Sequence, residues 1–161
     1  MSTPRRWLPV TIVSLFLLAA IQQAFAARLS IWGAEPDFLL VGAICLSLLA
    51  DRSRGAIAGF LAGLAHGALA GSNLAAYAAS RAVGGFCASW SKVGGYEIRP
   101  LSVGTVTFAV SILTGVVWML IGLRSGIGGF LAATIGTAMV NGVLAMPMYA
   151  LLRRLADPPR R

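Results

Sequence analysis

The chain has 161 residues, of which 58% are hydrophobic and only 11% are charged, with a net charge of +8. Soluble domains carry about 25% charged residues, and disordered chains are poor in apolar side chains, so the composition excludes both classes. Charge-free stretches cover residues 7–27, 55–80, 100–123 and 125–152. Each is longer than the roughly 20 residues that a helix needs to cross the hydrocarbon core of a bilayer. The sequence therefore predicts an all-α integral membrane protein.

The length limits how often the chain crosses the membrane. At about 20 residues per helix, with short loops, the chain accommodates six transmembrane helices and no separate extramembrane domain. We expect a single transmembrane domain over residues 1–161. Its six spans are expected, in chain order, at residues 7–27, 36–50, 55–71, 74–90, 101–123 and 127–152.

The first two spans carry signals at their ends. The first ends in Ala24-Phe25-Ala26, the small-residue pattern of a signal-peptidase site. Its apolar run exceeds the about 7–15 residues of a signal-peptide core, so we expect this span to stay uncleaved. The second begins near Pro36, because proline suits the first turn of a helix.

The third and fourth spans are predicted to form a hairpin around the turn Gly71-Ser72-Asn73. In the third span, glycine recurs at every fourth position and so lies on one ridge of the helix, where a second backbone can come close. These glycines are Gly55, Gly59, Gly63, Gly67 and Gly71. We expect a packing seam, either against the alanine-rich fourth span or against another protein, and internal packing is the favoured interpretation.

Basic residues are distributed unequally between the two sides of the six predicted spans. Two of them, Arg28 and Arg124, lie on one side. The other side holds Arg5, Arg6, Arg52, Arg54, Lys92, Arg99, Arg153, Arg154, Arg160 and Arg161. Because Lys and Arg are retained in the cytoplasm, both termini are expected to be cytoplasmic.

Arg81 interrupts the fourth span, where an arginine is costly unless it finds water or a partner. At a rise of about 1.5 Å per residue, Arg81 lies about 10 Å below the outer surface and His66 about 7 Å. Together with Tyr77 they define a candidate polar pocket. Two simpler interpretations stay open: Arg81 extends outward to the surface, and His66 is neutral and bonded to a carbonyl. Asn141, in the sixth span, is expected to donate a hydrogen bond between helices.

We expect no enzyme chemistry and no cofactor. The chain has one histidine, and Glu35 and Asp37 are assigned to the outer mouth. Neither a Ser-His-Asp relay nor a carboxylate pair is then available inside the membrane, and Walker-type phosphate loops are absent. Cys45 and Cys87 lie in apolar runs, where thiols behave as small hydrophobic groups, so neither a disulfide nor a metal site is expected. The positive charge is attributed to membrane orientation and not to nucleic-acid binding.

Several motifs lie between residues 36 and 86. A Pro-Asp pair opens the second span in PDFLLVGAICLSLL, a Gly-x-x-x-Gly-Phe pattern opens the third, and a Gly-Ser turn leads to a small-residue helix with Tyr77. In these motifs, and in the closing pattern NGVLAMPMYALLRR, the chain resembles the bacterial rod shape-determining protein MreD family. It departs from that family at His66-Gly67, where members often carry an acidic residue, and at Leu74-Ala75, where they have Leu-Gly.

The resemblance implies a non-catalytic subunit of the cell-elongation machinery in the bacterial cytoplasmic membrane. Its expected partners are membrane lipid, the single-span protein MreC, the MreB filament system, and RodA with its transpeptidase. The family also resembles the substrate-binding subunits of energy-coupling-factor transporters, so the alternative is a capture subunit for a vitamin or metal. In that case Ala20 and Ala24 on the first span would dock a transport partner, and the level of Arg81 and His66 would form the substrate pocket.

Overall fold

Six α-helices and one short 3₁₀ helix make up the part of the chain that the structure, a computed structural model, describes: residues 7–30, 34–91, 99–122 and 127–156. The elements are α1 (Trp7–Phe25), η1 (Ala27–Leu29), α2 (Phe38–Leu48), α3 (Arg52–Ala70), α4 (Leu74–Trp90), α5 (Pro100–Gly122) and α6 (Ile127–Ala156). The predicted all-helical fold is therefore confirmed for these residues.

Within the described residues, three helices are long and apolar enough to cross a membrane. They cover Trp7–Phe25, Pro100–Ile121 and Gly128–Ala156, and α2 is a shorter apolar helix. The outer face of α1 exposes large apolar side chains, and Phe16 on this face is 77% exposed. Water disfavours such a face, whereas lipid tails accommodate it. The apolar helices indicate a membrane-embedded protein.

Capping residues explain where α2 and α3 begin. The Asp37 side chain accepts a hydrogen bond from the backbone N of Leu40, and the Asp51 side chain accepts one from the backbone N of Arg54. A carboxylate at this position satisfies backbone donors of the first turn that have no partner within the helix. As a result α3 begins at Arg52, three residues before its predicted start.

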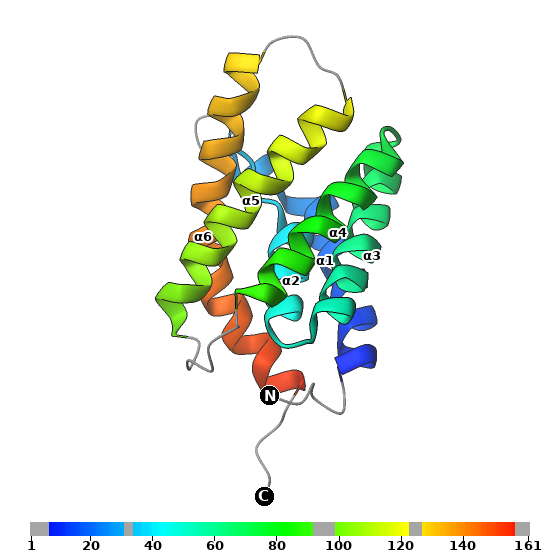
Figure 1. Ribbon diagram of the computed structural model, residues 1–161, viewed down its shortest axis with the longest axis vertical. Helices are drawn as coiled ribbons and strands as arrows, with labels where there is room; N and C mark the ends of the chain where they lie inside the picture. The colour runs from blue at the N-terminus through cyan, green and yellow to red at the C-terminus, as the bar shows by residue number, and fades with distance from the viewer. Residues whose placement is uncertain (1–6, 31–33, 92–98, 123–126, 157–161) are drawn as a thin grey trace, which may run out of the picture.

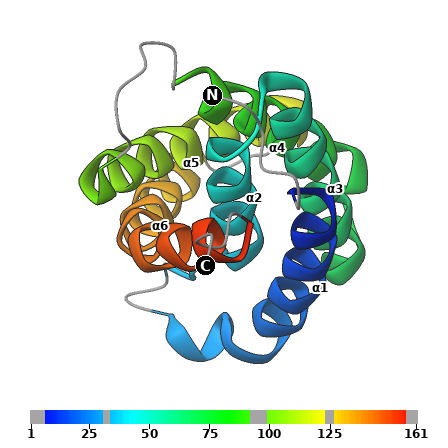
Figure 2. The same ribbon diagram turned by 90° about the horizontal axis from the view of Figure 1, so that it is seen from below.

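The second helix is the centre of the bundle. All eleven residues of α2 are buried, and Figure 2 shows the other helices arranged around it. At about 1.5 Å per residue α2 is about 16 Å long, roughly half the about 30 Å of a hydrocarbon core. It is thus a short internal helix, surrounded by the other helices.

The predicted turn between the third and fourth helices is confirmed. Gly71 has φ 64° and Asn73 has φ 53°, so both adopt the left-handed conformation that glycine and asparagine tolerate best. Two left-handed residues within three positions reverse the chain tightly. In consequence α3 and α4 lie side by side (Figure 1).

Apart from Arg28 in η1 and the buried Arg81, the described basic residues lie at one end of the bundle. This end holds the starts of α1 and α3 and the ends of α4 and α6, while the α3–α4 turn lies at the other (Figure 1). Its exposed arginines are Arg52, Arg54, Arg99, Arg153 and Arg154. The predicted count also used Arg5, Arg6, Lys92, Arg124, Arg160 and Arg161, which lie outside the described residues.

Candidate functional site

Four of the five glycines of the predicted stripe face α4 at very short range. A Cβ atom added at Gly63 would lie 2.6 Å from Cα of Ala78 and would also contact the carbonyl oxygen of Tyr77. One added at Gly59 would contact the carbonyl oxygen of Arg81, and one at Gly67 would lie 2.8 Å from Cα of Leu74. The neighbouring atoms are backbone, which cannot rotate away. The stripe therefore packs inside the molecule, backbone against backbone.

The two ends of the stripe differ from each other. At Gly55 an added Cβ would contact Oγ of Ser89 and lie 2.8 Å from the carbonyl oxygen of Gly85. At Gly71 nothing lies within 4 Å, and its backbone caps α3 in the left-handed conformation. The prediction that Gly71 belongs to the packing seam is wrong, because its role is to end the helix.

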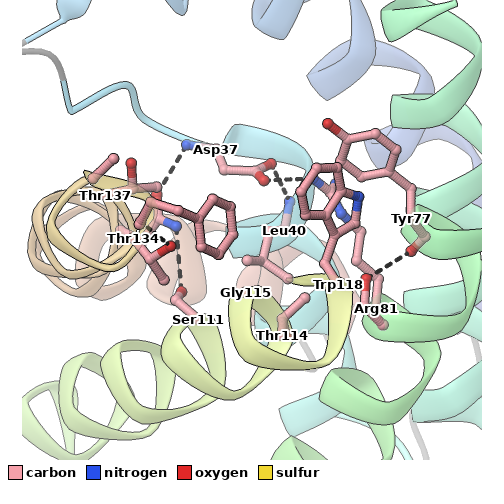
Figure 3. A pocket seen from close by; sticks show the side chains of 14 residues that line it. Asp37, Leu40, Tyr77, Arg81, Ser111, Thr114, Gly115, Trp118, Thr134 and Thr137 are labelled. Carbon is pink, nitrogen blue, oxygen red and sulfur yellow. Dashed lines mark hydrogen bonds and ion pairs between the residues drawn. The ribbon is translucent and has the colours of Figure 1, made fainter. Parts of the chain in front are cut away.

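Arg81 is buried in the bundle and does not extend to the surface. Only 2% of its area is exposed. Its Nη2 donates to Oδ2 of Asp37 at 2.5 Å and to Nδ1 of His66 at 2.8 Å. The arginine is therefore neutralised by a carboxylate from another helix, as a buried charge requires. Figure 3 shows the carboxylate of Asp37 directed toward this contact.

The contact with Arg81 defines the state of His66. A guanidinium nitrogen can only donate, so Nδ1 of His66 must accept, which assigns a neutral ring with its proton on Nε2. The open interpretation of a neutral His66 agrees with this geometry, but its partner is Arg81 and not a carbonyl. Asp37, Arg81 and His66 together thus carry no net charge.

Asp37 lies in a different environment from the one predicted. It was placed at the outer mouth with Glu35, yet the Asp37 side chain is 16% exposed and paired with Arg81, whereas Glu35 is exposed. The backbone N of Asp37 donates to Oδ1 of Asn141 at 2.9 Å. The available signal was Asp37 itself, a capping residue immediately before an apolar run. Helix α2 begins at Phe38, so Pro36 precedes the helix and does not lie in its first turn as predicted.

Asn141 joins three helices. Besides accepting from Asp37 at the start of α2, it donates through Nδ2 to Oγ of Ser111 on α5 at 3.3 Å. Asn141 itself is fully buried on α6. The predicted hydrogen bonding of Asn141 between helices is confirmed.

A cavity of about 310 Å³ opens beside these residues, lined from α2, α4, α5 and α6. Asp37 and Arg81 supply its charged groups (Figure 3). Asn141 supplies its amide group. Its hydroxyl groups come from Tyr77, Ser80, Ser111, Thr114, Thr134 and Thr137. Of the predicted pocket residues, Tyr77 and Arg81 line the cavity, while His66 lies behind Arg81.

A row of four rings crosses the bundle at this level. The ring centroids of His66 and Tyr77 are 4.6 Å apart, those of Tyr77 and Trp118 are 5.6 Å apart, and those of Trp118 and Phe130 are also 5.6 Å apart. Each ring comes from a different helix, α3 to α6 in order. Contacts at these distances are favourable ring packing. Trp118 and Phe130 were not predicted, because apolar rings within apolar spans give no distinguishing signal.

The thiols lie apart from this site. Cys45 and Cys87 are both free, and Sγ of Cys45 donates to the carbonyl oxygen of Ala145 at 3.6 Å. Within the described ranges no group of three or more His, Cys, Asp or Glu side chains could hold a metal ion.

Fold and site together define a membrane-embedded helical protein with a polar cavity among its helices. Comparisons of the chain with protein-family models, with curated proteins and with solved structures found no match.

Proposed function

We propose that this protein is a non-catalytic subunit of the bacterial cell-elongation complex, of the MreD type. The observation that carries the proposal is that the motifs of resemblance, between residues 36 and 86, coincide with one packing unit made of α2, α3 and α4. Asp37 of the Pro-Asp motif caps α2 and pairs with Arg81. Gly59 of the Gly-x-x-x-Gly-Phe motif lets the backbone of α3 pack directly against that of α4. Both motifs thus have a structural role in the same unit.

We infer six membrane crossings, with both termini in the cytoplasm and the protein in the bacterial cytoplasmic membrane. Support comes from the exposed arginines at the end of the bundle where α1 starts and α6 ends, since basic residues are retained on the cytoplasmic side. Fluorescent reporters that fold only in the cytoplasm should fluoresce when fused to either terminus. A dark fusion at one terminus only would refute an even number of crossings.

The proposed mode of action is association within the membrane. The rigid α2–α3–α4 unit provides a frame, and the exposed apolar faces, such as that of α1, are available to lipid and to partner helices. The proposed partners are MreC, the MreB filament system, and RodA with its transpeptidase.

The second candidate is a substrate-capture subunit of an energy-coupling-factor transporter. The observation in its favour is the cavity, whose about 310 Å³ falls at the lower end of the range for small-molecule sites. Ala20 and Ala24, the proposed docking residues of α1, are both exposed.

Purification of the full chain from its native membranes separates the two candidates. In mild detergent, mass spectrometry of the co-purified proteins should detect MreC together with RodA-type proteins. Recovery of ATPase subunits and a vitamin in their place would overturn the cell-elongation proposal. A matched pair of variants tests whether the frame matters: Gly63→Leu should reduce recovery of the partners, while Gly128→Leu, where nothing lies within 4 Å, should leave it unchanged.

A further inference from the structure

We propose that the cavity between α2, α4, α5 and α6 binds a small, uncharged ring compound that carries a carbonyl-type hydrogen-bond acceptor. This inference goes beyond the proposed function and holds whether the protein acts as an elongation subunit or as a capture subunit.

The size and walls of the cavity define the size and shape of the ligand. Its volume of about 310 Å³ suits a molecule of one or two rings, since larger ligands occupy sites toward the upper end of about 300–1,000 Å³. Tyr77, Trp118 and Phe130 line it with three aromatic side chains. Aromatic walls favour ring compounds through stacking and edge contacts.

The charge balance of the site excludes charged ligands. Asp37 and Arg81 line the cavity and neutralise each other, and His66 behind them is neutral. A net charge brought into this low-dielectric place would lose its hydration without gaining a free counter-charge. An uncharged ligand carries no such cost.

A buried donor indicates which polar group the ligand presents. Nη1 of Arg81 has no hydrogen-bond partner among the described residues, although Arg81 is 98% buried and lines the cavity. Leaving a charged donor unpaired is costly, and one neutral acceptor removes the cost. A carbonyl oxygen supplies such an acceptor. The nearby hydroxyls of Ser111, Thr114 and Thr137 can donate or accept and so suit further polar substituents.

The test uses three ring compounds of equal size and different charge: benzamide, benzoate and benzylammonium. Binding to the purified full-length protein in lipid nanodiscs is measured by saturation-transfer NMR titration. We expect benzamide to bind at least about tenfold more tightly than either ion, because only the ions pay the desolvation penalty. Equal binding of an ion, or no detectable binding of benzamide, would overturn the proposal.

Two neighbouring alanines of α6 give a matched pair of variants. Ala133 lines the cavity and Ala132 does not, and both are exposed, so neither substitution needs to disturb the core. Ala133→Phe should place a ring in the cavity and weaken benzamide binding at least about tenfold, while Ala132→Phe should bind as the unsubstituted protein does. Unchanged melting temperatures of both variants establish that the fold is retained. Benzamide binding that survives Ala133→Phe, or that is lost equally in both variants, would contradict the assigned site. Partner recovery from membranes is a separate readout, so failure here leaves the proposed function standing.

Discussion

The two sides of α4 are built in opposite ways. On the side toward α3, Gly59 and Gly63 bring the backbone of α3 directly against the backbone of α4. The side toward α5 and α6 carries Tyr77 and Arg81 and leaves room for a cavity. The carbonyl oxygens that Gly63 and Gly59 approach belong to these same two residues. The close packing on one side therefore sets the position of the polar groups on the other.

The largest change is expected from breaking the ion pair of the polar side. Arg81→Leu leaves the buried charge of Asp37 without its partner, which should lower the free energy of unfolding by about 3–5 kcal/mol. Reversible denaturation in mixed micelles measures this loss. As a control, Arg54→Ala removes the half-exposed ion pair in which Nε of Arg54 lies 3.5 Å from Oδ2 of Asp51. The free energy of unfolding is expected to fall by only about 0–1 kcal/mol in this variant.

A double-variant cycle sharpens this prediction. Asp37→Asn keeps a good capping residue on α2 while removing the charge. Combined with Arg81→Gln, it should destabilise the protein by clearly less than the sum of the two single losses, because no unpaired charge is left. Strict additivity of the two losses would show that the pair is not coupled.

The next largest change is expected from the packed side of α4. Gly63→Ala forces a Cβ against the backbone of Tyr77 and Ala78 and should cost about 1–3 kcal/mol, as overpacking does. Gly128→Ala is the matched control, since nothing lies within 4 Å of the added atom. Alanine favours a helix over glycine by up to about 1 kcal/mol, so the control should be neutral or stabilising. Denaturation in the same micelles compares the free energies of unfolding of the two variants. Equal values would show that Gly63 is not required for close packing of α3 on α4.

A smaller loss is expected where α2, α5 and α6 are joined. Asn141→Ala removes the acceptor for the backbone N of Asp37 and the donor to Ser111. The expected cost is about 1–2 kcal/mol, the range for polar contacts between membrane helices. Thermal unfolding of Ser111→Ala, which removes only the acceptor of the Nδ2 bond, separates the two bonds.

The smallest change is expected at the turn. Gly71→Ala places a side chain in the left-handed conformation and should cost about 1 kcal/mol. Gly71→Asn should be close to neutral, since asparagine tolerates this conformation. If both variants lose the same stability in thermal unfolding, backbone conformation is not what selects glycine here.

Hydropathy and glycine spacing predict the helices and the α3–α4 seam because these features depend on local composition and period. The estimated depths also placed Arg81 and His66 at one level near Tyr77, since antiparallel helices joined by a tight turn keep their register. The ion pair of Asp37 with Arg81 was not predicted, because every span was assumed to start at the membrane surface. The helix that Asp37 caps is instead short and internal. Trp118 and Phe130 could not be predicted, since which apolar rings meet depends on packing between helices and not on their own sequence.

The bond between Asp37 and Asn141 joins residues 104 positions apart. The ribosome must therefore synthesise most of the 161-residue chain before this connection can form. Until α6 arrives, one flank of α2 lacks its final neighbour, and the amide of Asp37 lacks its acceptor. The finished bundle is thus closed by its last helix, so chains truncated before Asn141 keep the seam of glycines but cannot complete the cavity.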